Sequence, residues 1–322
     1  MTIMTKERTR NMNIQHGIGT AHGKIILIGE HAVVYGAPAL ALPLQDLTIR
    51  VEITPDKDFT TLHSKYFNGK LHEAPSDLDN LKAILHHFMN DHPEFSKPLC
   101  ITIDNTLPSE RGMGSSAAVA TALVRALFDY FALPLSEEEL DEYVDIAEKI
   151  AHGNPSGVDA LIVKNDMPFL FKKNTYAKKI TLHMPGYLVI ADTGQVGQTR
   201  GAVAGVAEYR KENIQKFEKE FEEILALIEH TLSAINEKDL EALGMAMNET
   251  QDILRNWTVS NEKLDELTSA ALKAGAIGAK LTGSGRGGCM IALASNFEKA
   301  EEIAHTLEQS GAVSTWIHSL NR

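Results

Sequence analysis

The chain has 322 residues, of which 43% are hydrophobic and 23% are charged, and these proportions argue against a disordered or fibrous protein. This length suits two packed domains better than one core. The formal net charge of -12 argues against a protein that coats nucleic-acid backbones. A local phosphate site remains compatible with that charge, because backbone amides and one or two cations are sufficient to hold an anion.

Cysteine usage and hydropathy indicate a cytoplasmic protein. Cys100 and Cys289 are too few for a disulfide framework or a multi-cysteine zinc site, and the histidines show no metal-ligand spacing. No segment has the length of apolar chain needed to cross a bilayer, and the amino terminus lacks a signal core. We expect no membrane or nucleic-acid partner. Residues 1–11 read like a vector-derived leader, with Met12 as the natural start, and are left out of the fold prediction.

The first third of the chain after this leader is predicted to be rich in strands. Apolar runs at residues 25–28, 47–53 and 99–103 are separated by turn residues, which is typical of strands. Within this region, the helical spacing of apolar residues at 77–90 predicts one helix.

Two helices are predicted next. The alanine-rich segment 116–132 has high helix propensity. Ser136 and Glu139 have the spacing of a capping box, and the helix that follows them is stopped by glycine and proline at residues 153–155. Its apolar face consists of Leu140, Val144, Ala147 and Ala151.

The second half of the chain is predicted to be mainly helical. After a turn-rich stretch near Asp192, residues 198–236 form a long helical region, in which the apolar residues from Ile214 to Leu232 indicate one core-facing helix. Further elements are predicted in the order helix, helix, strand, glycine loop, strand, helix and strand, the helices at residues 239–256, 261–274 and 297–309 and the last strand at 314–318. Two closely packed α+β domains are the natural arrangement of these elements.

The segment PSERGMGSSAA at residues 108–118 lies between a predicted strand and a predicted helix. Gly112 and Gly114 allow the backbone to approach a ligand closely, and the free amides of the first helical turn favour an anion. The hydroxyls of Ser115 and Ser116 suit a phosphate or a magnesium ion. A glycine turn with a serine N-cap is the simpler interpretation of this segment alone. A Walker A loop is excluded, because its Gly-Lys-Ser/Thr sequence is missing.

Residues 23–36, GKIILIGEHAVVYG, place a lysine and a Glu-His pair at opposite ends of a buried strand. Taken alone, Lys24 is more simply a solvated flank of that strand. Residues 148–160, EKIAHGNPSGVDA, place Glu148 one turn from a helix end and return Asp159 towards the same region. Taken alone, these two carboxylates are more simply a surface acid and a helix cap.

Residues 280–289, KLTGSGRGGC, match the G-x-G-x-x-G pattern of dinucleotide-binding proteins. That pattern requires a helix immediately afterwards, whereas the apolar residues that follow predict a strand. We therefore predict a loop between two strands. Arg286 in this loop is either an additional cation near a phosphate or a solvent-facing side chain.

The four segments together closely resemble the motifs of the GHMP kinases and, within that superfamily, of the mevalonate kinases. The string HGNPSGVD at residues 152–159 is the most specific match. Galactokinases typically continue Gly-Glu-His with Thr-Asp, whereas Ala-Val-Val follows here. Arg111 stands where small residues are common in the family, and Arg286 stands where glycine is common.

The resemblance implies a two-domain α+β fold, with a sheet-rich N-terminal GHMP kinase domain at residues 1–183 and a ferredoxin-like α/β sandwich as the C-terminal domain at residues 184–322. It also implies an enzyme of the mevalonate pathway of isoprenoid biosynthesis that phosphorylates the primary hydroxyl of mevalonate, with ATP and Mg²⁺ as cofactors. A homodimer is common among the relatives.

The resemblance also assigns roles to individual residues. Asp159 is the expected acceptor of the hydroxyl proton, and Lys24 is expected to hold that aspartate ionised and to favour the alkoxide. Ser116 and Glu148 are the expected Mg²⁺ ligands. The nucleotide-binding residues implied by the motifs are Pro108, Arg111, Gly112, Met113, Gly114, Ser115, Ser116, Ala117, Gly283, Ser284 and Gly285. The implied substrate contacts are Glu30, His31, Ser156 and Thr199.

Two other functions are compatible with the phosphate loop. A phosphomevalonate kinase shares this loop, and an added basic cluster near the substrate would favour it. A catalytically silent ligand sensor of the same family is expected to have lost Lys24, Asp159 or Glu148, and all three are present. The sequence does not identify the residues that contact adenine.

Overall fold

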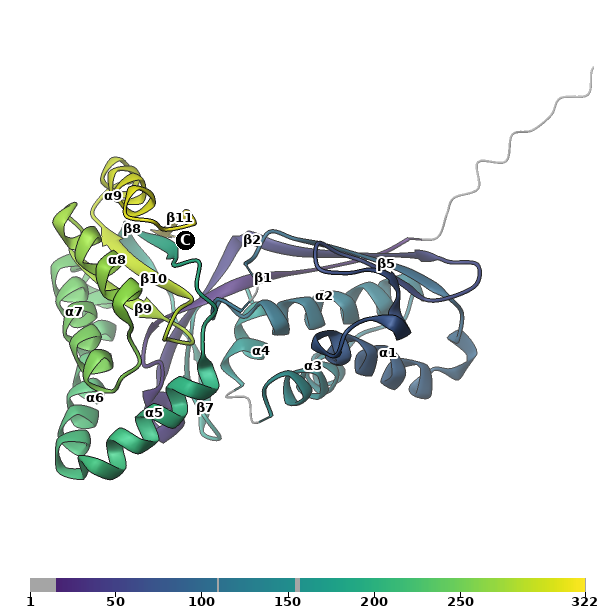
Figure 1. Ribbon diagram of the computed structural model, residues 1–322, viewed down its shortest axis with the longest axis horizontal. Coiled ribbons are helices and arrows are strands. Elements are labelled where there is room, and N and C mark those ends of the chain that lie inside the picture. The colour runs from purple at the N-terminus through teal and green to yellow at the C-terminus, as the bar shows by residue number, and fades with distance from the viewer. Residues whose placement is uncertain (1–15, 109, 154–156, 322) are drawn as a thin grey trace, which may run out of the picture.

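The computed structural model describes residues 16–108, 110–153 and 157–321. They form two halves, each built on one sheet, that lie side by side along the longest axis of the molecule (Figure 1). The predictions for residues 1–11 and Ser156 lie outside the described residues.

The first half is built on a seven-stranded sheet with the order β4-β3-β5-β2-β6-β7, in which β1 pairs with β2. All neighbouring strands are antiparallel except β3 and β5. The strands are β1 (Gly17–Ile28), β2 (Ala39–Pro55), β3 (Thr61–His63), β4 (Asn68–Lys70), β5 (Leu99–Asn105), β6 (Phe169–Lys172) and β7 (Tyr176–Lys179). The helices are α1 (Asp79–Asp91), α2 (Ser115–Tyr130), α3 (Glu137–His152) and α4 (Val158–Val163).

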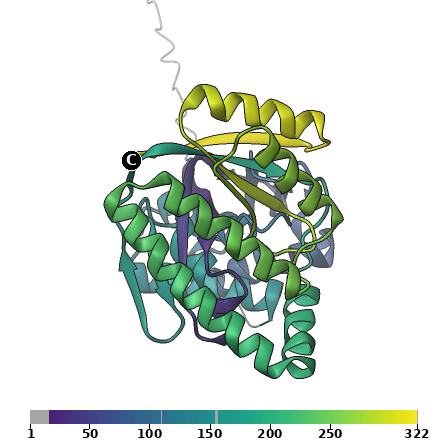
Figure 2. The same cartoon turned by 90° about the vertical axis from the view of Figure 1, so that its left-hand side faces the viewer.

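The second half contains a four-stranded antiparallel sheet with the order β11-β8-β10-β9. Its strands are β8 (His183–Asp192), β9 (Gly278–Thr282), β10 (Cys289–Ala294) and β11 (Ser314–Asn321). Its helices are α5 (Thr199–Glu212), α6 (Ile214–Glu237), α7 (Leu240–Asn256), α8 (Glu262–Lys273) and α9 (Phe297–Gln309). Figure 2, in which this half faces the viewer, shows the green helices α6 and α7 side by side in front of the strands.

Helix α2 packs directly on strand β1, and small residues make this close approach possible. A Cβ atom at Gly19 would lie 2.0 Å from the Ala122 carbonyl oxygen and 2.4 Å from the Ala126 nitrogen, so no larger residue fits there. The alanines predicted to favour a helix therefore also bring it within reach of the sheet. This packing fixes the start of α2 beside the middle of β1, where Lys24 lies.

Most predicted elements are confirmed, including the capping box of Ser136 and Glu139 at the start of α3. The prediction of one helical region at residues 198–236 is wrong, because the backbone leaves the helical conformation at Asn213 and separates α5 from α6. Ile214, predicted to face the core, is 61% exposed because it begins the new helix at this corner. The division at residue 183 remains a prediction.

Candidate active site

A cleft of about 660 Å³ opens where the 110–116 segment, the end of α3 and the start of α5 meet. The polar part of its wall includes Glu110, Arg111, Gly112, Gly114, Ser115, Ser116, His152, Asp159, Thr199, Arg200 and Ser284. The apolar part includes Leu62, Leu78, Leu81, Ile103 and Val119. Three of the four motifs singled out from the sequence therefore contribute residues to one wall, and the fourth contributes Lys24 from directly behind it.

Two glycine loops cross at the edge of this cleft. Gly112 has a φ of 74°, and a Cβ atom on it would lie 2.6 Å from the Ser284 nitrogen. Reciprocally, a Cβ atom on Gly283 would lie 2.4 Å from the Gly112 carbonyl oxygen. Both positions require glycine, because the left-handed backbone and the close approach each exclude a side chain. The segment between β5 and α2 is thereby held against the segment between β9 and β10.

The N-terminus of α2 is a suitable anion site. Gly114 is its N-cap, with a φ of 73° and no side chain to cap the helix. The N–H groups of the first turn lack intrahelical acceptors, and the positive end of the helix dipole lies there. Ser284 Oγ is buried beside the crossing loops without a hydrogen-bond partner. Phosphate oxygens are the ligands that satisfy such donors.

Lys24 and Asp159 form an ion pair at the base of the cleft, with 2.8 Å between Nζ and Oδ1. The side chain of Lys24 is only 3% exposed, whereas that of Asp159 is 32% exposed. The ammonium group also donates to the Gly112 carbonyl oxygen at 3.0 Å, so it links the carboxylate to the phosphate-type loop. Asp159 lies in the first turn of α4 as its second residue, two positions after the N-cap Gly157. A proton acceptor thus faces the cleft while its cation is shielded from water.

Glu148 and Ser116 place two further oxygens near this pair. The Glu148 side chain is 4% exposed, and its Oε1 and the Ser116 Oγ are both buried without a hydrogen-bond partner. Burial raises the pKa of Glu148 to about 7, with a further contribution from the negative charge of Asp159, against the opposing effects of the nearby Ser116 hydroxyl and of Lys24. A carboxylate that is costly to ionise and an unsatisfied hydroxyl fit a site for a hard cation, which supplies the missing positive charge.

No group of three or more His, Cys, Asp or Glu side chains among the described residues is arranged to hold a metal ion. A cation bound by Glu148 and Ser116 therefore needs oxygen ligands from a bound phosphate or from water. Mg²⁺ is commonly held in that way, by one or two protein oxygens together with substrate phosphates.

Arg111 and Arg286 mainly connect elements of the protein. Arg111 Nε donates to the buried Asp192 carboxylate at 2.8 Å, and its Nη2 donates to the Gly194 carbonyl oxygen at 3.2 Å. Arg286 Nε donates to the Thr258 carbonyl oxygen at 2.9 Å. Arg286 is partly exposed and its Nη2 also donates to Thr258 Oγ1 at 3.1 Å, so it is bound to the chain after α7, and its proximity to a phosphate remains a prediction.

Glu30 and His31 are buried behind the cleft rather than in its wall. Glu30 forms a buried ion pair with Lys280 of β9. His31 has a φ of 60° and lies against Gly285, where burial lowers the pKa of its imidazole to about 4. Their contact with a substrate remains a prediction, whereas Thr199 lies in the cleft wall at the first residue of α5.

The apolar wall of the cleft and three of its basic residues, Lys65, His152 and Arg200, were not predicted from the sequence. Arg200 Nη2 donates to the Ala151 carbonyl oxygen at 3.4 Å, which brings the start of α5 to the end of α3. His152 lies 3.8 Å from Glu148. Arg200 and His152 lie in segments that had been singled out from the sequence, beside predicted site residues, and this proximity was the available signal. Lys65 lies outside those segments, so the sequence offered no such signal for it.

Comparisons with known proteins identify the family of the chain. The family model described as GHMP kinases N terminal domain matches residues 79–164, and the one described as GHMP kinases C terminal matches residues 231–313. The fold is that of a two-domain GHMP kinase. None of the helices within the described residues is long and apolar enough to cross a membrane.

Similarity to individual relatives extends over almost the whole chain. The mevalonate kinase of Pyrococcus furiosus is 31% identical, with 91% of this chain and 93% of that protein covered. The crystal structure of mevalonate kinase from methicillin-resistant Staphylococcus aureus is 36% identical with a TM-score of 0.75, covering 96% of this chain and all of that one. The L. major mevalonate kinase, solved in complex with R-mevalonate, is 26% identical with a TM-score of 0.83, covering 95% and 98%. The chain belongs to the mevalonate kinase family.

Proposed function

We propose that the chain transfers the γ-phosphate of ATP to the primary C5 hydroxyl of mevalonate, which yields 5-phosphomevalonate and ADP. The observation that carries this proposal is the Lys24–Asp159 pair, at 2.8 Å, beside the uncapped N-terminus of α2. Phosphoryl transfer requires an aligned nucleophile and neutralisation of charge, and little covalent chemistry from the protein.

Asp159 accepts the proton of the attacking hydroxyl, because it is the carboxylate that faces the cleft. Lys24 orients this carboxylate through their ion pair and places a positive charge where the alkoxide develops. The Gly112 carbonyl oxygen, which accepts from Lys24, keeps the ammonium group between the nucleophile and the phosphate loop. Arg200, at the start of α5, adds a cation to the lining of the cleft.

The nucleotide phosphates bind at the N-terminus of α2, where Gly112 to Ala117 present their amides and Gly283 to Gly285 close the loop. The base occupies the apolar part of the cleft formed by β3, α1 and α2, because a purine buries its faces against aliphatic side chains. Asn80 and Asn105 in the same wall supply polar groups for its edge.

Mg²⁺ is the fitting cofactor, because Glu148 Oε1 and Ser116 Oγ are buried acceptors without partners next to the phosphate site. Glu148 and Ser116 would hold the ion, and its positive charge would offset the negative charge of the nucleotide phosphates. Glu148→Gln is expected to raise the Mg²⁺ concentration needed for half-maximal activity, and an unchanged magnesium titration would exclude Glu148 as a ligand.

The activity is tested with a coupled ADP-release assay that offers mevalonate, phosphomevalonate, galactose and homoserine in parallel. Turnover of mevalonate alone is expected. Preference for phosphomevalonate would assign the chain to the next kinase reaction, and no turnover with any of the four would favour a ligand sensor. A homodimer remains a prediction, which a sedimentation measurement checks.

A further inference from the structure

Strand β9 lies at the edge of the second sheet, and its outward-facing N–H groups depend on side chains of α7. In the sheet order β11-β8-β10-β9, β9 pairs only with β10 among the described strands. Ala279 and Leu281 are nearly or fully buried, so an unsatisfied N–H group at either would be costly. Asn248 Oδ1 accepts from the Ala279 N–H at 2.9 Å, and Gln251 Oε1 accepts from the Leu281 N–H at 2.8 Å.

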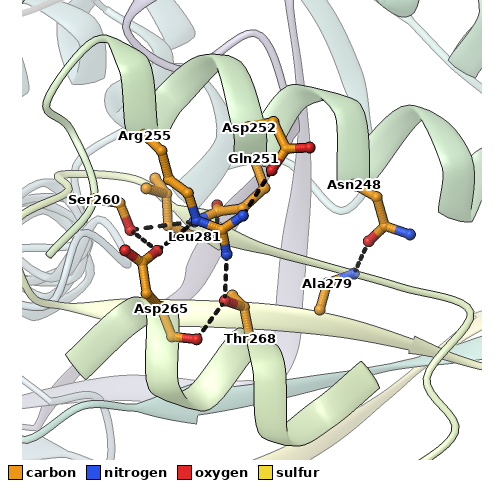
Figure 3. Close-up of polar contacts among 9 residues, drawn as sticks. All are labelled: Asn248, Gln251, Asp252, Arg255, Ser260, Asp265, Thr268, Ala279 and Leu281. Atoms are coloured by element: carbon orange, nitrogen blue, oxygen red, sulfur yellow. Dashed lines mark hydrogen bonds and ion pairs between the residues drawn. The ribbon is translucent and has the colours of Figure 1, made fainter. Parts of the chain in front are cut away.

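The Gln251 amide is itself held from the other side, as Figure 3 shows. Its Nε2 donates to Ser260 Oγ at 3.2 Å and to Asp265 Oδ1 at 3.3 Å. Asp265 also accepts from Arg255 Nε at 2.8 Å. These two acceptors lie on the NH₂ side of the amide, so its oxygen is left facing β9 and accepts from the Leu281 N–H. Gln251 therefore has one orientation, and it is 2% exposed.

Lys280 and Thr282, the β9 residues that alternate with Ala279 and Leu281, contact the first half of the molecule through their side chains. Lys280 pairs with Glu30 after the end of β1. Thr282 Oγ1 donates to the Ile26 carbonyl oxygen and accepts from the Ile26 N–H, both at 2.9 Å. The Thr282 hydroxyl thus satisfies the backbone N–H and carbonyl oxygen of Ile26, as a neighbouring strand would otherwise do. Ile26 is two residues from Lys24, so both lie on the same strand within one repeat of the pleat.

We propose, building on the kinase function proposed above, that Gln251 is a positioning residue for phosphoryl transfer. Its bond to the Leu281 N–H fixes β9 in the register that places Thr282 on Ile26, and this contact sets the position of Lys24 opposite Asp159. Gln251 itself does not line the cleft. This hydrogen bond is important because side chains alternate between the two faces of a sheet. A shift of β9 by one residue would turn Lys280 and Thr282 to the other face.

The test compares Gln251→Met, Thr282→Val and the double variant with the wild-type enzyme. Each change keeps the side-chain volume nearly constant and removes one set of hydrogen bonds. Each single variant is expected to lower kcat about tenfold, because a small misplacement of a catalytic group is costly, while the KM values for ATP and mevalonate change less than about twofold. The double variant is expected to be no slower than the slower single variant, since both changes break the same connection.

Thr250→Val is the matched control, because Thr250 neighbours Gln251 on α7, is 1% exposed and donates its own buried hydrogen bond to the Ala246 carbonyl oxygen at 2.7 Å. It should lose stability without losing kcat. Equal kcat in Gln251→Met and Thr250→Val, or multiplying effects in the double variant, would overturn the proposal. Normal kcat in Thr282→Val would also overturn it, even if Gln251→Met does not fold.

Amide hydrogen exchange provides a readout that does not depend on activity. The Leu281 and Ile26 amides are expected to lose protection together in Gln251→Met and to keep it in Thr250→Val. Retained protection of Ile26 would overturn the proposed connection. If the wild-type chain fails to phosphorylate mevalonate, the proposed function is wrong, and exchange still decides whether Gln251 holds β9 on β1.

Discussion

At the scale of single residues, the proposed chemistry depends on the buried ammonium group of Lys24 and the more exposed carboxylate of Asp159. Lys24 is enclosed by β1, the Gly114 backbone and Asp159, and a Cβ atom on Gly114 would lie 3.0 Å from its Cγ. This enclosure fixes the ammonium group, because a long flexible side chain has little freedom in such a space. The carboxylate is therefore held by an already ordered partner, which favours one orientation towards the cleft.

Removing the charge of Asp159 tests this unit. Asp159→Asn keeps the shape of the side chain but loses the proton acceptor, so turnover of mevalonate should fall by roughly 10²- to 10⁴-fold. The affinity for ATP, measured by calorimetry, should remain nearly unchanged. Asp166→Asn is the control, since the Asp166 side chain is 82% exposed. Near-normal turnover in folded Asp159→Asn would remove this residue from the proposed role.

His31 predicts how stability depends on pH. Its folded-state pKa is lowered to about 4 from an ordinary value of 6.5, mainly by burial and also by the charges of Lys280 and Arg286. The unfolded chain therefore takes up the proton first, and the contribution of neutral His31 is complete above pH 6.5 and is lost as the pH falls towards 4. The loss amounts to about 3 kcal/mol in full.

Urea denaturation of the wild type and of His31→Gln, at about pH 7.5 and about pH 5, measures this effect. The wild type should lose more stability than the variant over this interval. Glu148 acts in the opposite direction, because its raised pKa costs stability as the pH rises from 4.5 to about 7. That contribution cancels in the difference between the two proteins. Equal pH slopes would contradict the prediction for His31.

Residue types in a motif could be predicted from the sequence, whereas the partners of individual side chains could not. Lys24, Glu148 and Asp159 were marked together because each lies in a recognisable string. Arg111 was marked as a nucleotide contact, but its guanidinium pairs with Asp192, which is 81 residues away along the chain. Nothing in a one-dimensional pattern identifies such a partner, because long-range ion pairs depend on how the sheets are placed.

At the scale of elements, the site depends on the crossing of two loops that each follow a strand. The 110–114 segment and the 283–288 segment touch through backbone atoms, with Gly112 against Ser284 and Gly288 against the Arg111 carbonyl oxygen. Because these contacts are between backbone atoms, rotation of a side chain cannot relieve a clash there. The position of the phosphate site is thus set by both halves of the molecule.

Gly112→Ala tests this contact. The new Cβ atom would lie 2.6 Å from the Ser284 nitrogen, so the loops must separate, and the KM for ATP should rise about tenfold or more. Gly36→Ala is the matched control, because Gly36 also has a positive φ, of 93°, but has open space around its Cβ position. Both variants should lose roughly 1–2 kcal/mol from backbone strain. A normal KM in Gly112→Ala would show that the crossing does not shape the nucleotide site.

Helices with a regular apolar face were the most predictable elements, and short or edge elements were the least. The prediction of α9 at residues 297–309 agrees with its observed bounds. Strands β3, β4, β6 and β7 have only three or four residues each, too few for an alternating pattern to stand out. Helix α4 was not predicted, because six residues after a glycine have no repeat of an apolar face.

At the scale of the whole molecule, polar contacts behind and beside the cleft join the two halves. They are the Glu30–Lys280 ion pair, the hydrogen bonds of Thr282 to Ile26, and the Arg111–Asp192 ion pair. Their charges come from segments at least 81 residues apart, so the relative placement of the halves is a property of the folded chain alone. The cleft lies next to these contacts, and Arg111 is also part of its wall.

The Glu30–Lys280 pair predicts the last effect of substitution. Both side chains are at most 1% exposed, and Glu30 Oε2 has no hydrogen-bond partner, so the Lys280 ammonium is the main compensation for a buried negative charge. Lys280→Met leaves that charge unpaired and should cost about 3–5 kcal/mol in the free energy of unfolding. Combining it with Glu30→Gln removes both charges and should restore part of the stability, since an uncharged pair has no such desolvation cost. Urea denaturation of the two single variants and the double variant measures this coupling, and additive losses would show that the two halves are held together without this ion pair.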